Sequence, residues 1–141
     1  MAEVVLDASV VVKWFVEEDH TPEARHLLDA STPYVAPDLI FAEVANTIWK
    51  KVRRGDISNE TARAIVADLL LIDIDTVPCR DLTREAHALS AETGRSVYDA
   101  MYLALAVRLN TRLITADQRL ANAIRSRPLL APHIQFIADT P

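Results

Sequence analysis

Four carboxylate side chains in separate segments of the chain could together hold a divalent cation. They are Asp7, Glu43, Asp99 and Asp117. Carboxylate oxygens are the ligands that Mg²⁺ and Mn²⁺ prefer. A metal held in this way with open positions polarises a phosphate group and lowers the pKa of a bound water, so no histidine base is needed. If the four segments converge, the sequence predicts phosphoryl chemistry at an acidic cluster.

Each of these carboxylates also has a structural explanation. Asp7 lies where a side chain commonly caps the N-terminus of a helix. The spacing Ser96-x-x-Asp99 matches a capping box, and residues 115–118 match a second one, which would leave Asp117 only a favourable charge near a helix end.

Convergence would separate the two explanations, because four carboxylates in one place repel one another unless a cation neutralises them. Glu43, one turn into a predicted helix, could by itself be an exposed helix residue. Asp99 is more informative, because it precedes eight successive apolar residues (100–107), where an unpaired charge is costly.

Short apolar segments alternate with helical segments along the 141 residues, a length that fits one domain over residues 1–141. The predicted strands are 3–7, 34–36, 74–77, 112–115 and 133–137. The predicted helices are 8–15, one that begins at 21, 38–54, 58–72, 80–92, 97–109 and 117–125. This alternation predicts an α/β fold with a short, mainly parallel sheet flanked by helices. Chemistry in such folds gathers outside the carboxyl ends of the strands, where Asp7 and Asp117 lie.

Local signals mark several helix ends. Thr21 followed by Pro22 predicts an N-cap and a first helical residue, and Ser58 predicts another N-cap. Gly55 predicts the end of the preceding helix. The segment 97–109 is apolar nearly all round and is predicted to be buried.

Composition excludes several other kinds of site. Gly55 and Gly94 are the only glycines, too few for a glycine-rich phosphate-binding loop. Cys79 is alone, which excludes an internal disulfide and a cysteine-framed zinc site. The longest apolar run has eight residues against the ~20 of a membrane span, and Glu3 and Asp7 interrupt the first apolar stretch, unlike a secretory signal. We therefore expect a cytoplasmic protein without membrane contact.

The net charge is −5, but the basic residues are grouped. Residues 50–54 hold four Lys or Arg, and residues 95–127 hold six Arg against two Asp. Because attraction is local within a Debye length of ~8 Å, compact basic segments can bind a polyanion even on an acidic protein. Solvated helix faces are the alternative explanation.

Four sequence blocks surround the carboxylates. They are Val4-Val-Leu-Asp7-Ala-Ser9-Val, Pro37-Asp-Leu-Ile-Phe-Ala-Glu43-Val-Ala-Asn46, Ser96-Val-Tyr-Asp99-Ala-Met-Tyr-Leu-Ala-Leu-Ala106 and Leu113-Ile-Thr-Ala-Asp117-Gln-Arg-Leu120. In this order and spacing, over nearly the whole chain, they resemble the PIN-domain ribonucleases, and within them the VapC toxins of bacterial and archaeal toxin–antitoxin pairs. The resemblance implies a PIN-like three-layer sandwich and a metal-dependent endoribonuclease.

The resemblance also implies roles for the acidic residues. All four would form the catalytic site, with Asp7 and Asp99 as the principal ligands of Mg²⁺ or Mn²⁺. Asp117 would complete the metal site together with Glu43, partly through water.

Two hydroxyl groups, those of Ser9 and Thr115, would hold the cluster or its waters by the same resemblance. Family members usually form homodimers and are inhibited by a partner antitoxin, here a VapB-type protein. The implied substrate is RNA, and DNA would be bound only indirectly, through the antitoxin.

One helical stripe could connect the acidic cluster to RNA. Glu43, Thr47, Lys50 and Arg54 fall at i, i+4, i+7 and i+11, and so share one face of the predicted helix. At about 1.5 Å per residue, Lys50 lies about 10 Å beyond Glu43 along the helix axis. We therefore predict that Lys50 and Arg54 contact the RNA backbone; a solvated helix end is the alternative.

Other functions fit the sequence less well. A haloacid-dehalogenase-type phosphatase and a response-regulator receiver domain both need a lysine late in the chain, and all three lysines lie before residue 52. The alternative that stays open is a non-catalytic module that binds RNA or an antitoxin and has a metal-binding acidic pocket. Tyr98 and Tyr102 flank Asp99, and the sequence assigns neither hydroxyl to the site.

Overall fold

A five-stranded parallel sheet forms the centre of the computed structural model, which describes residues 3–139. The strands are β1 (Val4–Leu6), β2 (Tyr34–Pro37), β3 (Asp75–Val77), β4 (Leu113–Thr115) and β5 (Ile134–Phe136). They lie in the order β3-β2-β1-β4-β5, and all four pairings are parallel. β1, β2 and β4 are buried along their whole length, as expected of short apolar strands covered on both faces. The predicted α/β fold with a mainly parallel sheet is confirmed.

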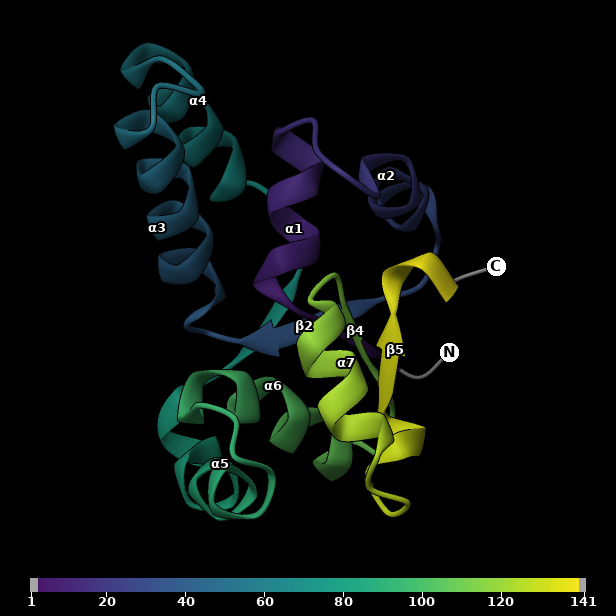
Figure 1. Ribbon diagram of the computed structural model, residues 1–141. Helices are drawn as coiled ribbons and strands as arrows, with labels where there is room; N and C mark the ends of the chain where they lie inside the picture. The colour runs from purple at the N-terminus through teal and green to yellow at the C-terminus, as the bar shows by residue number, and fades with distance from the viewer. Residues whose placement is uncertain (1–2, 140–141) are drawn as a thin grey trace.

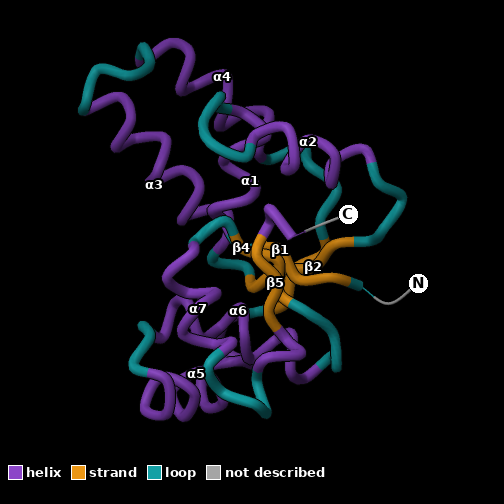
Figure 2. The backbone as a smooth tube through the Cα atoms, turned by 45° about the vertical axis from the view of Figure 1, so that its right-hand side comes forward, coloured by secondary structure: helices purple, strands orange, loops and turns teal. Residues whose placement is uncertain are grey.

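Helices cover both faces of this sheet and complete three layers (Figures 1 and 2). One layer holds α1 (Ala8–Phe15), α2 (Thr21–Asp29), α3 (Ile40–Arg53) and α4 (Asn59–Leu69), and α3 and α4 rise away from the sheet as a pair. The other layer holds α5 (Cys79–Thr93), α6 (Val97–Arg108) and α7 (Gln118–Arg125). Two short 3₁₀ turns, at Ala131–His133 and Ile137–Asp139, flank β5.

Helix α6 is the most deeply buried element of the second layer. Every residue from Ala100 to Ala106 is buried, and the helix packs against β1, β2 and β4. This agrees with the prediction made from its nearly continuous apolar sequence. A helix enclosed in this way has little freedom to move, so it gives the carboxylate on its first turn, Asp99, a rigid base.

The expected helix ends are mostly confirmed. Ser58 and Ser96 cap α4 and α6 by accepting hydrogen bonds from the backbone N–H groups three residues ahead, at 3.0 and 3.1 Å. The prediction for α2 is wrong: its N-cap is His20, in the left-handed region at φ 66°, and Thr21 is already helical. The reason is burial, since the enclosed Thr21 hydroxyl accepts from the N–H of Glu18 and donates to the carbonyl of Val16, closing the preceding turn instead.

The strand order opens a crevice at one place along the sheet edge. From β1 the chain adds β2 and then β3 on one side of β1 within the sheet. It then returns to add β4 and β5 on the other side of β1. Connections after β1 and β4 therefore diverge, and the crevice between them at the carboxyl ends of the strands is where open α/β sheets bind ligands. Within residues 3–139 no helix combines the length and apolar character needed to cross a bilayer.

Candidate active site

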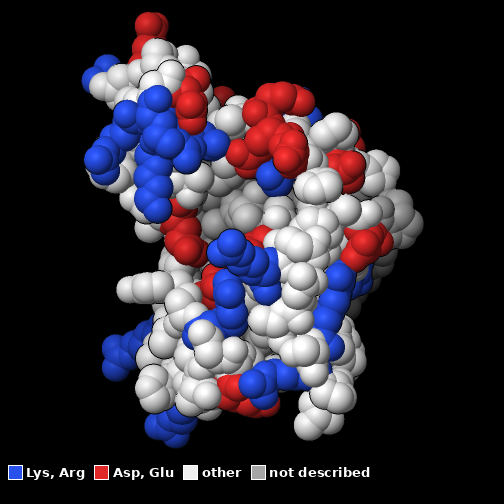
Figure 3. All heavy atoms as spheres, viewed as in Figure 1, with Lys and Arg blue, Asp and Glu red and all other residues white. Residues whose placement is uncertain are grey.

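A cavity of about 300 Å³ lies at the carboxyl ends of β1 and β4. The four predicted carboxylates, those of Asp7, Glu43, Asp99 and Asp117, all line it, together with the carboxylate of Glu18. Figure 3 shows this face of the molecule hollowed, with acidic atoms inside the hollow and basic side chains gathered on two of its sides. Four segments far apart in the sequence thus bring their carboxylates to one place, as the sequence predicted they would if the acids act together.

Asp7 directly follows β1 and is held by two hydroxyl groups. Its Oδ2 accepts hydrogen bonds from Ser9 at 2.6 Å and from Thr115 at 2.8 Å. The same hydroxyls accept from the backbone N–H groups of Ala116 and Asp117, both at 3.0 Å, so they join the turn after β1 to the turn after β4. Asp7 occupies the N-cap position of α1 without a side-chain capping bond, so capping does not explain this residue.

Burial raises the pKa of Asp7 to about 6, although the two hydroxyl donors oppose the shift. The charges of Asp99 and Glu43 raise it further. This carboxylate is therefore kept ionised at neutral pH against both desolvation and repulsion, and a cation beside it would relieve both.

Asp99 and Asp117 share a cation that the sequence did not reveal, the guanidinium of Arg95. Its Nη2 lies 3.0 Å from Oδ2 of Asp99 and 3.5 Å from Oδ2 of Asp117. Asp117 is also the N-cap of α7, because its Oδ1 accepts from the N–H groups of Arg119 and Leu120 at 3.0 and 3.1 Å. The predicted box over 115–118 is therefore wrong in its first residue: the cap of α7 is Asp117 rather than Thr115, so Asp117 is more than a favourable charge near the helix end.

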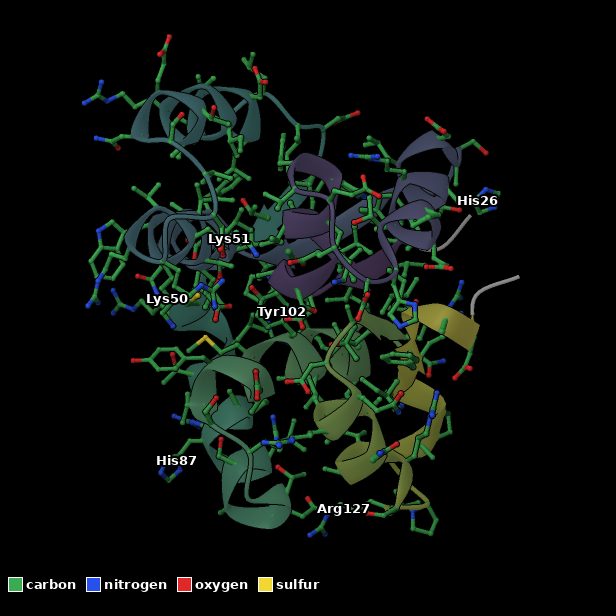
Figure 4. All side chains as sticks on the ribbon, turned by 45° about the horizontal axis from the view of Figure 1, so that its top comes forward. His26, Lys50, Lys51, His87, Tyr102 and Arg127 are labelled. Atoms are coloured by element: carbon green, nitrogen blue, oxygen red, sulfur yellow. The ribbon has the colours of Figure 1, made fainter. Side chains whose placement is uncertain are left out.

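Glu43 lies in the first turn of α3, and Tyr102 reaches it from α6. The Tyr102 hydroxyl donates to Oε1 of Glu43 at 2.6 Å, and Figure 4 shows Tyr102 between α6 and α1. Burial raises the pKa of Glu43, the bond from Tyr102 lowers it, and the charge of Asp99 raises it. Burial and the nearby carboxylates also raise the pKa of Tyr102, so its hydroxyl stays protonated and donates. Its spacing of three from Asp99, on one helix face, was the available signal for this residue.

A group of three charges, two of them on buried lysines, joins α1 to α3 beside the cavity. Lys13 and Lys51 each bond to one oxygen of Glu18, at 3.0 and 2.9 Å, and both lysines are nearly inaccessible to solvent. We call these three residues the Glu18 triad. Two of its members, Lys13 and Glu18, line the cavity with the acids. A lysine within the apolar run Val10–Phe15 was the signal that sequence reasoning did not use.

The predicted RNA contacts, Lys50 and Arg54, lie outside the cavity lining. Both are exposed, and Arg54 is 3.3 Å from Asp56. Figure 4 shows Lys51 directed from α3 towards α1, whereas Lys50 lies on another side of α3. Lys50 lies in the last turn of α3 and Arg54 at its C-cap, and Figure 3 shows basic side chains gathered over this helix. Contact of the two residues with RNA stays a prediction.

The donor set of the cavity suits a hard divalent cation, because it consists of carboxylate and hydroxyl oxygens without sulfur or imidazole. Within residues 3–139, however, no three His, Cys, Asp or Glu side chains are placed to hold a metal together. The hydrogen bonds explain this, since each carboxylate is directed to a protein donor: Asp7 to two hydroxyls, Glu43 to Tyr102, and Asp99 and Asp117 to Arg95. The oxygen ligands in the cavity are of the kind that Mg²⁺ or Mn²⁺ prefers. In the metal-free chain, the positive charge of Arg95 supplies part of the neutralisation that such an ion would provide.

Comparison with known proteins agrees with this architecture. The family model of the PIN domain matches residues 4–125. Ribonuclease VapC3 of Pyrobaculum aerophilum is 31% identical over 119 residues, which cover 83% of this chain and 91% of that protein. The segment that the family model matches, residues 4–125, contains all four carboxylates and both hydroxyls of the site.

Two solved structures share the fold at low identity. One is the Mycobacterium tuberculosis toxin VapC20, described as cleaving the sarcin-ricin loop, with a TM-score of 0.65 and 17% identity over 86% of this chain and 95% of that one. The other is VapBC2 of Rickettsia felis bound to a promoter DNA fragment, with a TM-score of 0.61 and 14% identity over 94% of this chain and 97% of that one. At such identities these structures show a common fold.

Proposed function

The chain belongs to the PIN-domain family, and on that premise we propose that it is a metal-dependent endoribonuclease and the toxin of a type II toxin–antitoxin pair. The observation that carries the proposal is the lining of one cavity by Asp7, Glu43, Asp99 and Asp117. Its homology to a VapC ribonuclease supports RNA as the substrate.

Three carboxylates, those of Asp7, Asp99 and Asp117, would hold Mg²⁺ or Mn²⁺. Bound there, the ion supplies Lewis-acid polarisation of the phosphate and a water of lowered pKa. The chain itself fixes the ligand geometry: Ser9 and Thr115 orient the Asp7 carboxylate, and the α7 cap orients Asp117. Preorganised charge of this kind is what stabilises a transition state without reorganisation during the reaction.

Glu43 is suited to take the proton of the attacking water. Tyr102 holds Oε1, which leaves Oε2 to accept the proton. Burial raises the pKa of Glu43 towards the range in which a general base works best at neutral pH. The four acids therefore divide into a metal-holding group and a base.

The surface around the cavity suits a polyanion. Basic side chains flank the hollow on two sides, over α3 and over the ends of α6 and α7, while the acids lie within it (Figure 3). An RNA strand across the hollow would place one phosphate at the acids and its neighbours against these two basic groups. Lys50 and Arg54 would contact the backbone on the α3 side.

The partners proposed are RNA, a VapB-type antitoxin and a second copy of the chain as a homodimer. A related fold, VapBC2 of Rickettsia felis, is described in complex with promoter DNA. By this likeness, DNA would be bound here only through the antitoxin. Location in the cytoplasm, where RNA and such partners meet, belongs to the same proposal.

The test is cleavage of a total-RNA pool by the purified chain without its antitoxin. Reactions contain Mg²⁺ or Mn²⁺, or EDTA, and use wild type, Asp99→Asn and the matched control Asp68→Asn, which changes an exposed carboxylate on α4. We expect metal-dependent cutting by wild type and by the control, and none by Asp99→Asn. A folded, metal-binding protein that cuts no RNA would favour the non-catalytic binding module instead.

A further inference from the structure

The Arg95 guanidinium occupies the space between two carboxylates that a divalent cation would need. It contacts Oδ2 of Asp99 and Oδ2 of Asp117 through one nitrogen, Nη2. Both carboxylates line the cavity, and among the described residues neither pairs with another Lys or Arg. A metal that bound these oxygens would have to displace the guanidinium.

This pairing uses little of the hydrogen-bonding capacity of arginine. A guanidinium has five N–H donors in a planar fork. Here Nη2 serves both carboxylates, and Nε is buried with no hydrogen-bond partner in the part of the chain that the structure describes. Because a buried, unpaired N–H is unfavourable, the arrangement is one that a better set of partners can replace.

The two oxygens of Asp117 have separate partners, which permits an exchange without loss of helix α7. Oδ1 holds the N–H groups at the start of α7, and Oδ2 meets Arg95. Removing Arg95 from Oδ2 leaves the cap intact. The cost of displacing the guanidinium is therefore confined to its own contacts.

The backbone at Arg95 is fixed from both sides. Gly94 ends α5 in the left-handed region at φ 74°, and Ser96 caps α6. A displaced Arg95 side chain can therefore move only by rotation about its own bonds, and its backbone stays beside the two carboxylates. A planar guanidinium there matches the oxygens of a phosphate group, which it can bind with two parallel hydrogen bonds.

We propose that Arg95 exchanges partners during the catalytic cycle. In the metal-free chain it neutralises Asp99 and Asp117; once a divalent cation holds these carboxylates, its guanidinium binds a phosphate of the RNA beside the scissile bond. The inference rests on the proposed function, and it identifies Arg95 as a substrate-binding residue and an internal competitor of the metal. Because the metal frees the group that RNA needs, metal and RNA strengthen each other's binding, and thermodynamic linkage makes the effect reciprocal.

The first test measures metal affinity without RNA. Mn²⁺ is titrated into wild type, Arg95→Gln, Arg95→Lys and Arg84→Gln, with free Mn²⁺ followed by electron paramagnetic resonance. Arg84→Gln removes the same charge from an exposed site on α5. We expect Arg95→Gln to bind Mn²⁺ roughly fivefold more tightly or better, and Arg84→Gln to match wild type. Arg95→Lys retains the competing charge and should lie closer to wild type than Arg95→Gln. Equal affinity of Arg95→Gln and wild type would overturn the inference.

The second test separates exchange of partners from simple loss of charge. Binding of a short labelled single-stranded RNA is measured by fluorescence anisotropy in EDTA and in Ca²⁺, and the RNA is checked by gel to be intact. Wild type should gain roughly fivefold or more in RNA affinity when Ca²⁺ is added, whereas Arg95→Gln should gain little. If Arg95→Gln gains as much as wild type, Arg95 does not bind the phosphate.

Failure of the inference and failure of the proposed function give different results. If no variant binds Mn²⁺, wild type included, metal dependence fails and the inference fails with it. If wild type binds Mn²⁺ and cuts RNA while Arg95→Gln matches it in both tests, the nuclease stands and the role of Arg95 alone is refuted. Circular dichroism of each variant confirms that the fold is retained.

Discussion

The hydroxyl oxygen of Tyr102 lies 2.6 Å from Oε1 of Glu43, and this bond joins α6 to α3 at a residue that lines the acidic cavity. It connects the most enclosed helix of one layer to a helix of the opposite layer. Glu43 thereby acquires a fixed orientation that its own helix could not provide, because it lies only one turn from the start of α3.

Tyr102→Phe should shift the pH dependence of RNA cleavage. The lost bond lowers the pKa of Glu43 in wild type, so its removal raises that pKa and protonates the base at a higher pH. The rate at pH 6 should fall by about three- to tenfold relative to the rate at pH 8. Cleavage is measured over this range, with the exposed Tyr98→Phe as the matched control. If the fall in rate at low pH occurs at the same pH in Tyr102→Phe and wild type, Tyr102 does not influence the base.

Asp7→Asn should stabilise the metal-free protein while it abolishes cleavage. The pKa of Asp7 is raised from 3.8 to about 6, so the folded state binds its proton more tightly than the unfolded state does. The contribution of Asp7 to stability is therefore fully present below its unfolded pKa of 3.8 and is lost as the pH rises through about 6. Asn, which carries no charge, should recover on the order of 1–3 kcal/mol at pH 8 in EDTA.

Urea denaturation at pH 4 and pH 8 measures this effect. The gain should vanish at pH 4, where Asp7 is protonated in the folded state, and Asp68→Asn on the surface should show no such gain. An Asp7→Asn protein no more stable than wild type at pH 8 would contradict the destabilisation that we ascribe to the buried charge of Asp7.

Thr115→Val should weaken both the fold and the site. The enclosed hydroxyl donates to Asp7 and accepts from the N–H of Asp117, and valine leaves that N–H without its partner. The expected loss is about 1–3 kcal/mol of unfolding free energy, together with slower cleavage. Thr83→Val, an exposed threonine on α5, provides the comparison. Equal stability of the two variants would show that the hydroxyl is dispensable.

Lys50→Ala with Arg54→Ala should reduce RNA affinity and flatten its salt dependence. If both side chains contact phosphates, the slope of log affinity against log salt should decrease by about 1–2. Binding to single-stranded RNA is measured from 50 to 200 mM salt, with the double variant Arg80→Ala and Arg84→Ala on α5 as the control. A slope identical to that of wild type would assign Lys50 and Arg54 to solvated surface instead.

Much of the architecture could be read from local sequence patterns. The central strands β1, β2 and β4 are short apolar runs, because burial on both faces imposes that composition there, whereas the edge strand β3 is polar and largely exposed. Helix α6 was recognisable for the same reason. The error at Thr21 arose because a buried hydroxyl can serve the preceding turn instead of the helix, and the local sequence is the same in both cases.

The carboxylates of the site were predictable because the ends of the elements that bear them leave recognisable signals. The contacts of Arg95, Tyr102 and Lys13 were not, since helix spacing and an apolar neighbourhood can mark such residues but do not say which group a long side chain reaches. Arg95 lies four residues before Asp99, but its bridge to Asp117 crosses between two elements that only the folded chain brings together.

The Glu18 triad lowers the cost of separating α1 from α3 in water, compared with an apolar contact between the same helices. An apolar seam resists opening because it would expose hydrocarbon, whereas ions regain hydration when they separate. Separating α3 from α1 at this point would therefore return the two buried lysine charges to solvent, which hydrates them. We expect amide hydrogen exchange in the neighbouring turns of these helices to be faster than in α6, and the α3–α4 pair to be the part of the molecule that can swing outward to admit a bulky RNA.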